Sequence, residues 1–204
     1  SKSASPHRAP VSIIATLKAV AGNRDFLRYW WIAAQVFACY FALISVTPLI
    51  FMDALKLSEY QYALVLMVYG AAYLLGGVAA SYLQKRIALS RQINIGLGLL
   101  LAAGVLLALI IIFEAITTVT LLIPMLISAL AVTLVRPAAI SAAMLLFSSS
   151  AGTAASAGNS IMFLTAAVSS AALAQTGSHL LITIAVSFII FSLWGWLTNA
   201  RVGH

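Results

Sequence analysis

Six apolar stretches occupy most of the sequence between positions 30 and 197, and the polar residues are almost confined to the gaps between them. Each stretch has about the length that crosses a bilayer as a helix, roughly 20 residues. Hydrocarbon supplies no hydrogen-bond partners, so a chain inside it must be helical or form a closed barrel, and continuous apolar runs favour helices. The sequence therefore predicts an all-α integral membrane protein with six transmembrane helices. We expect them at residues 30–52, 61–83, 93–113, 119–140, 153–173 and 180–197.

The composition excludes a water-soluble domain. Hydrophobic residues make up 63% of the chain and charged residues only 7%, and the mean hydropathy is +1.09. A soluble domain carries roughly a quarter charged residues. A net charge of +7 would fit a nucleic-acid partner, but no basic stripe with interleaved aromatic residues is present, so we expect no nucleic acid.

The basic residues predict the orientation, because Lys and Arg are retained on the cytoplasmic side of a membrane during insertion. With six spans, most of them fall on one side: Lys2, Arg8, Lys18, Arg24, Arg28, Lys85, Arg86, Arg91 and Arg201. Lys56 falls on the other side. Trp30, Trp31, Trp194 and Trp196 lie at the expected cytoplasmic interface, where an indole keeps its N–H in water. Both termini are predicted to be cytoplasmic.

The chain divides into three parts by composition. Residues 1–29 form a polar, basic cytoplasmic linker, residues 30–198 the six-helix bundle, and residues 199–204 a cytoplasmic tail. Within the linker, apolar residues recur at helical spacing, which predicts either a short helix on the membrane surface or a plain tether. These apolar residues are Ile13, Ile14, Leu17 and Val20. Because the chain begins with Ser1 and no signal peptide precedes the first span, we expect it to be part of a longer protein.

Three segments resemble one family of transporters. The segments are NRDFLRYWW, ISVTPLIFMDALKLSEYQYALVLMVYGAAYLLGG and RPAAISAAMLLFSSSAGTAASAGNSIMF, at residues 23–31, 44–77 and 136–163. The first two resemble the seventh and eighth helices of Bcr/CflA-type drug:proton antiporters of the major facilitator superfamily, and the third resembles the tenth and eleventh helices. The loop QKRIALSR departs from the family pattern, since it lacks the expected aspartate. The resemblance implies the C-terminal half of a twelve-helix major facilitator fold.

The resemblance also implies a function. We expect half of a proton-coupled efflux transporter for multiple drugs or another small solute, working by alternating access in the bacterial inner membrane. Its partners would be the lipid bilayer, protons, a lipophilic or cationic small molecule and a missing N-terminal six-helix half, with no cofactor and no catalytic or metal site. Asp53, Glu59 and Glu114 lie at the outer ends of spans, so the proton carriers would belong to the missing half. The alternatives are a non-transporting membrane scaffold and a half-size carrier that pairs with a second chain.

Polar side chains within the spans are candidates for the wall of a substrate cavity. Tyr69 and Tyr73 are one helical turn apart and share a face. With methionines, such aromatic faces would suit lipophilic cations, although each hydroxyl or amide alone is better explained by a bond between helices. The candidates are Gln35, Tyr40, Ser45, Tyr69, Tyr73, Ser128, Thr133 and Asn159.

Arg136 is the only charge predicted to lie within a span, and two interpretations stay open. If the helix ends near residue 140, the guanidinium reaches the cytoplasmic headgroups. If the helix continues through Phe147 with a bend at Pro137, Arg136 lies deeper and faces a polar cavity. There it would hold a carboxylate from the other half or oppose a cationic substrate.

Small residues predict close contacts between helices. Pairs of Gly, Ala or Ser spaced by four positions let helix backbones approach closely. The residues expected at such contacts are Gly70, Gly76, Gly77, Gly152, Ser156 and Gly158.

Overall fold

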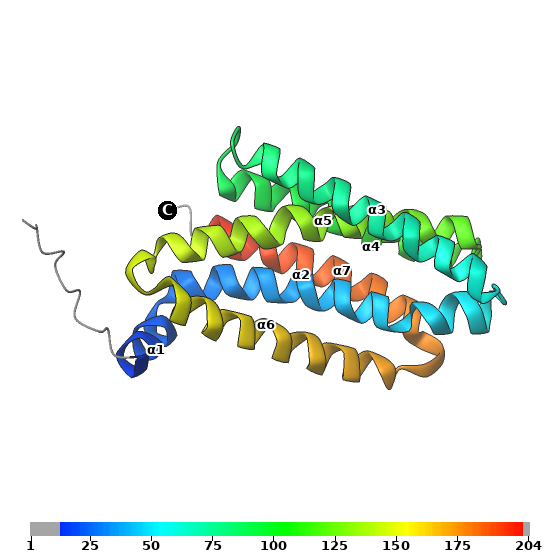
Figure 1. The fold of residues 1–204 in the computed structure, drawn as a ribbon. Helices are drawn as coiled ribbons and strands as arrows, with labels where there is room; N and C mark the ends of the chain where they lie inside the picture. Colours follow the sequence, from blue (N-terminus) through cyan, green and yellow to red (C-terminus); the bar gives the residue numbers. More distant parts are fainter. Residues whose placement is uncertain (1–12, 202–204) are drawn as a thin grey trace, which may run out of the picture.

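The computed structural model describes residues 13–201, which form a bundle of long helices without strands (Figure 1). Six of these helices, α2 to α7, are long and apolar enough to cross a membrane. The prediction of an all-α membrane protein with six spans is thereby confirmed. The elements are α1 (Ile13–Gly22), α2 (Arg24–Pro48), the π-helical η1 (Leu49–Ala54), α3 (Glu59–Leu83), α4 (Leu89–Ile112), α5 (Thr118–Leu145), the short 3₁₀ turn η2 (Ser148–Ser150), α6 (Ala151–Ala174), the 3₁₀ turn η3 (Gly177–His179) and α7 (Leu180–Ala200).

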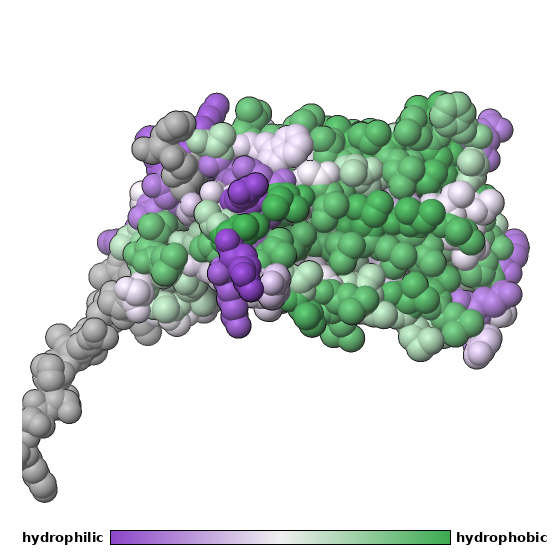
Figure 2. Space-filling model, turned by 90° about the horizontal axis from the view of Figure 1, so that it is seen from above, coloured by the Kyte–Doolittle hydropathy of each residue, from purple (hydrophilic) through white to green (hydrophobic). Residues whose placement is uncertain are grey.

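The surface of the bundle matches a membrane environment. Hydrophobic residues cover its middle, and hydrophilic residues gather towards the two ends (Figure 2). We call the end that holds α1, the α3–α4 turn and the last turn of α7 the basic end, because seven of the nine described basic residues gather there. They are Lys18, Arg24, Arg28, Lys85, Arg86, Arg91 and Arg201. The α2–α3 and α4–α5 turns lie at the opposite end.

Two helices form the centre of the bundle and two others lie at its edges. α2 packs against α5, α6 and α7, while α5 packs against α2, α3 and α4. α6 is held mainly by α2 and α3 mainly by α5, so these two helices lie on opposite sides (Figure 1). Only 22% of the membrane-spanning window of α3, and the same share of α6, is buried, against 61% for α2. α3 and α6 therefore present apolar side chains that this chain does not cover.

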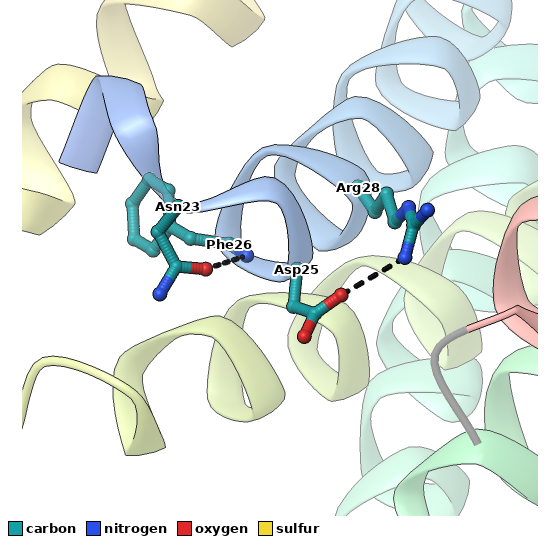
Figure 3. A network of polar contacts seen from close by, with 4 residues as sticks. All are labelled: Asn23, Asp25, Phe26 and Arg28. Atoms are coloured by element: carbon teal, nitrogen blue, oxygen red, sulfur yellow. Dashed lines mark hydrogen bonds and ion pairs between the residues drawn. The ribbon is translucent and has the colours of Figure 1, made fainter. Parts of the chain in front are cut away.

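The first transmembrane helix begins at Arg24, six residues before the predicted start at position 30. Asn23 caps it, because the Asn23 side chain accepts a hydrogen bond of 2.9 Å from the backbone N–H of Phe26 (Figure 3). Asp25 lies in the first turn, where a negative charge favours the helix dipole, and its carboxylate is 3.0 Å from the Arg28 guanidinium. Local capping thus extends α2 into the polar segment that precedes the apolar stretch.

The end of α2 contains a proline whose missing N–H is compensated. Pro48 cannot donate to the carbonyl of Ile44, four residues earlier. The Thr47 hydroxyl donates to that carbonyl instead, at 2.8 Å, and lies 2.8 Å from the Tyr62 hydroxyl of α3. The chain then continues as the π-helix η1. One hydroxyl therefore satisfies the helix end and joins α2 to α3.

Hydrogen bonds join α4 to its two neighbours near the basic end. The buried amide of Gln92 donates to the Leu134 carbonyl of α5 at 3.0 Å. From α7, the Trp196 indole donates to the Asn94 carbonyl at 3.1 Å, and the Asn199 amide donates to the Ser90 carbonyl at 3.0 Å. These bonds are directional, so they fix the register of α4 against α5 and α7.

Close helix contacts occur at some of the predicted small residues. A methyl group added to Gly158 of α6 would overlap the Trp30 indole of α2, and one added to Gly76 of α3 would overlap the Thr133 hydroxyl of α5. Trp30 is accordingly only 1% exposed and is not in the aqueous interface that the sequence predicted for it. Further close contacts involve Gly96, Gly104 and Gly195.

The remaining predicted packing residues do not make such contacts within residues 13–201. An added Cβ at Gly70, Gly77 or Gly152 would meet nothing within 4 Å. Ser156 is exposed and donates to the Thr153 carbonyl of its own helix. All of these residues lie on α3 and α6, and the reason is that each of these edge helices has a single main neighbour, which leaves most of its surface uncovered.

Candidate functional site

Four aromatic rings from two helices meet in the middle of the bundle. Tyr40 of α2 stacks on Tyr69 of α3 with ring centroids 5.8 Å apart and lies 5.4 Å from Tyr73. Phe37 of α2 adds a fourth ring, 6.4 Å from Tyr40. Tyr73 is ten residues before the end of α3 at Leu83, which places the cluster about 15 Å from the basic end of that helix. We call these four residues the aromatic cluster.

Arg136 of α5 lies beside the aromatic cluster. α5 continues through Pro137 to Leu145, five residues past the predicted end at position 140. Arg136 is thus nine residues, or about 13 Å, from the end of its helix. Its guanidinium carbon is 4.7 Å from the centre of the Phe37 ring, within the range of a cation–π contact. The helix therefore passes position 140, as the cavity interpretation of Arg136 requires, but it ends two residues before Phe147.

A groove of about 480 Å³ lies between α3 and α5 and includes Arg136 and Tyr73. Val132, Pro137 and Ile140 supply apolar surface, while hydroxyl, amide and guanidinium groups supply polar surface. The volume suits a small organic molecule. We call this space the α3–α5 groove, and its full lining is Tyr73, Gly77, Ala80, Ser81, Gln84, Val132, Thr133, Arg136, Pro137, Ile140 and Ser141.

The electrostatics of the groove are set by one charge. Arg136 is the only ionised side chain among the described residues that line it. The chain has four carboxylates: Asp25 and Glu59 in the first turns of α2 and α3, Asp53 near the end of η1, and Glu114 in the α4–α5 turn. None of them is near enough in its helix to reach the middle of the bundle. The α3–α5 groove is therefore positively charged.

Several donors and acceptors around this region have no partner within the described residues. They are the Tyr69 hydroxyl, the Gln35 side-chain oxygen, the Gln84 side-chain nitrogen and Nε of Arg136. Buried polar groups are normally paired. Two of these buried groups belong to Gln84 and Arg136, which are among the residues that line the α3–α5 groove. The site thus has hydrogen-bonding capacity that the chain does not use.

The other predicted cavity residues have different places. The hydroxyls of Ser128 and Thr133 are buried and donate to carbonyls of their own helix, α5, although Thr133 still borders the groove. Ser45 and Asn159 are exposed, and neither lies near the aromatic cluster in any contact of the described chain. The structure therefore brings together Tyr40, Tyr69, Tyr73, Thr133 and Arg136 and leaves Asn159 apart.

Two residues of the site escaped the sequence analysis. Phe37 is one of many apolar residues in its span, and nothing local distinguishes it. Gln84 follows the last residue of α3 and was read as part of a loop. Its signal was its position four residues after Ala80 and one turn beyond Ser81, which continues the face of α3 that borders the groove.

The family model described as Major Facilitator Superfamily matches residues 1–170. The chain belongs to the major facilitator superfamily. No curated protein matches it. Members of this superfamily are membrane transporters, and the six helices found here are consistent with half of the twelve-helix fold. The general function of the family to which this chain belongs is thus the transport of small molecules by multi-pass membrane proteins.

Proposed function

We propose that this chain is the C-terminal half of a Bcr/CflA-type exporter, which moves a small lipophilic solute by alternating access at the expense of a proton gradient. The observation that carries the proposal is the α3–α5 groove, with the aromatic cluster beside it, at mid-depth in a chain of a transporter superfamily. Transporters of this kind bind their solutes near the bilayer midplane, between the two halves. The groove would be one wall of that site.

The other half would supply the proton carriers. A carrier carboxylate has to lie at membrane depth, and the carboxylates of this chain lie at the ends of its helices. The uncovered apolar faces of α3 and α6 would meet the missing half. The same faces would also serve a half-size carrier that pairs with a second chain, and the mass of the polypeptide in its native membrane separates these two arrangements.

We also propose the orientation of the bundle. The basic end would face the cytoplasm of a bacterium and both termini would lie there, because positively charged segments stay on that side. Solute would then reach the α3–α5 groove from the cytoplasmic side, since the groove runs from the aromatic cluster towards Gln84 at the basic end.

Efflux measurements on cells that express the gene encoding this chain test the proposal. Energised cells should accumulate less of a fluorescent lipophilic solute than cells without the gene, and a protonophore should abolish the difference. Gly77→Leu should also abolish it, because a side chain at Gly77 would enter the groove without meeting other atoms within 4 Å of its Cβ. Gly22→Leu, at an equally open position on α1 outside the groove, is the matched control and should transport normally.

Equal accumulation with and without the gene, across a panel of solutes that differ in charge, would refute the exporter. Equal activity of the Gly77→Leu protein would refute the groove as the solute site while leaving the exporter in place.

A further inference from the structure

We propose that the α3–α5 groove binds the anionic group of an amphipathic aromatic solute, such as an aromatic carboxylate or sulfonate, and that Arg136 is the residue that receives this group. The inference rests on the proposed function and names the charge of the solute. It departs from the lipophilic cation that the sequence predicted, because the deciding group in the groove is a cation.

The first argument is the charge balance. Within the described residues, Arg136 has no carboxylate in salt-bridge range, and no acidic side chain lines the groove. An isolated guanidinium at membrane depth is unfavourable until an anion approaches it. A bound anion would therefore relieve an existing electrostatic cost, whereas a bound cation would add to it.

The second argument is the hydrogen-bonding inventory. The unpartnered groups on residues that line the groove, Nε of Arg136 and the side-chain nitrogen of Gln84, are both buried donors. The hydroxyls of Ser81 and Thr133 use their protons on carbonyls of their own helices. The residues at the end of α3 and on α5 that line the groove thus hold N–H groups for which the described chain provides no acceptor. Carboxylate and sulfonate oxygens are acceptors only, and they match such a pair.

The third argument is the orientation of Arg136. One face of the guanidinium lies over the Phe37 ring, at 4.7 Å. This contact fixes the plane of the group but leaves its N–H edge available, because a guanidinium donates in its plane. Arg136 can therefore stack on Phe37 and donate to an anion at the same time. A carboxylate accepts two such parallel bonds.

The remaining lining accounts for the rest of the solute. Tyr73, Val132 and Ile140 present aromatic and aliphatic surface in the same groove as Arg136. An anion without an apolar body would leave this surface in contact with water, whereas an aromatic acid would cover it. Fluorescein is an anionic probe of this class, and rhodamine 123 is a cationic probe with the same xanthene ring system.

The test is transport of these two dyes by membrane vesicles that contain the protein encoded by the gene, energised by a proton gradient. Wild-type vesicles should transport fluorescein, and Arg136→Gln should reduce this transport about tenfold to a hundredfold, the usual effect of losing a hydrogen bond to a charged group. Arg136→Lys keeps the positive charge and should retain part of the fluorescein transport. Rhodamine 123 should be transported poorly by the wild type and better by Arg136→Gln.

The matched control removes a positive charge outside the groove, at the basic end. Arg86 stacks on Tyr82 outside the groove, so Arg86→Gln should transport fluorescein like the wild type. Preferential transport of rhodamine 123 by the wild type, or an equal loss of both dyes in Arg136→Gln, would overturn the inference and leave the exporter standing. If the vesicles transported neither dye and no other solute in the panel, both this inference and the exporter would be overturned.

Discussion

The contact between Gly158 and Trp30 makes a sharp prediction about the stability of the bundle. Buried small or flexible residues recur every four positions along α6, at Ala154, Gly158 and Met162, and this stripe packs on α2. Gly158→Ala would push a methyl group into the Trp30 indole. We expect this substitution to lower the thermal stability of the protein.

The magnitude follows from the surroundings of the indole. Trp30 is 1% exposed, and its neighbour Phe26 is 0% exposed and 6.0 Å away between ring centres, so other side chains closely surround the indole. Overpacking of a rigid site costs about 3 kcal/mol at the upper end of the usual range. Alanine gains about 1 kcal/mol over glycine in a helix. The net loss of about 2 kcal/mol corresponds to a fall in Tm of about 4–8 °C.

The assay is the unfolding temperature of the detergent-solubilised protein, followed by size-exclusion fluorescence after heating. Gly152→Ala is the control on the same helix, because an added Cβ there meets nothing within 4 Å. Gly152 is the second residue of α6 and lies outside the helix interior, so Gly152→Ala should leave the Tm nearly unchanged. A fall of equal size for both variants would refute the assignment of Gly158 to a close helix contact.

Two further predictions concern the ends of the bundle. Tyr62→Phe removes the hydroxyl that lies 2.8 Å from Thr47, and should cost about 1 kcal/mol, or about 2–4 °C in Tm; an unchanged Tm would mean that this bond does not hold α3 to α2. In a Cys39→Ala background, Glu114→Cys should react with an impermeant maleimide in intact cells and Lys85→Cys only after lysis, and the reverse pattern would contradict the proposed orientation.

Hydropathy predicted all six spans because burial in lipid requires long apolar helices whatever their partners are. It placed the start of the first span too late, since Arg24 and Arg28 lower the local hydropathy although Asn23 and Asp25 stabilise the helix there. The predicted span at 119–140 already contained Pro137, but its end was placed too early. About 20 residues are enough to cross the bilayer, whereas α5 has 28 residues and ends at Leu145.

The candidate site was predictable only in part. The spacing of Tyr69 and Tyr73 fixes their common face, and Arg136 is conspicuous as a charge within an apolar span. The approach of Tyr40 and Phe37 to these residues depends on how α2, α3 and α5 pack, which no local pattern encodes. For the same reason, only some of the predicted packing glycines make close helix contacts: the same spacing occurs on the covered and the uncovered faces of α3.

The distribution of hydrogen bonds between helices shows where a crosslink would stabilise one conformation of the protein. Between helices, the described chain forms directional bonds from α4 to α5 and α7, and one from α2 to α3 near Tyr62. The α2–α6 surface is held by apolar packing alone, which resists added volume but supplies no directional bond to fix the register of the two helices. An engineered crosslink to α4 would therefore add little, because hydrogen bonds already fix this helix. A disulfide between a cysteine on α2 and one on α6 would instead restrict the protein to a single conformation.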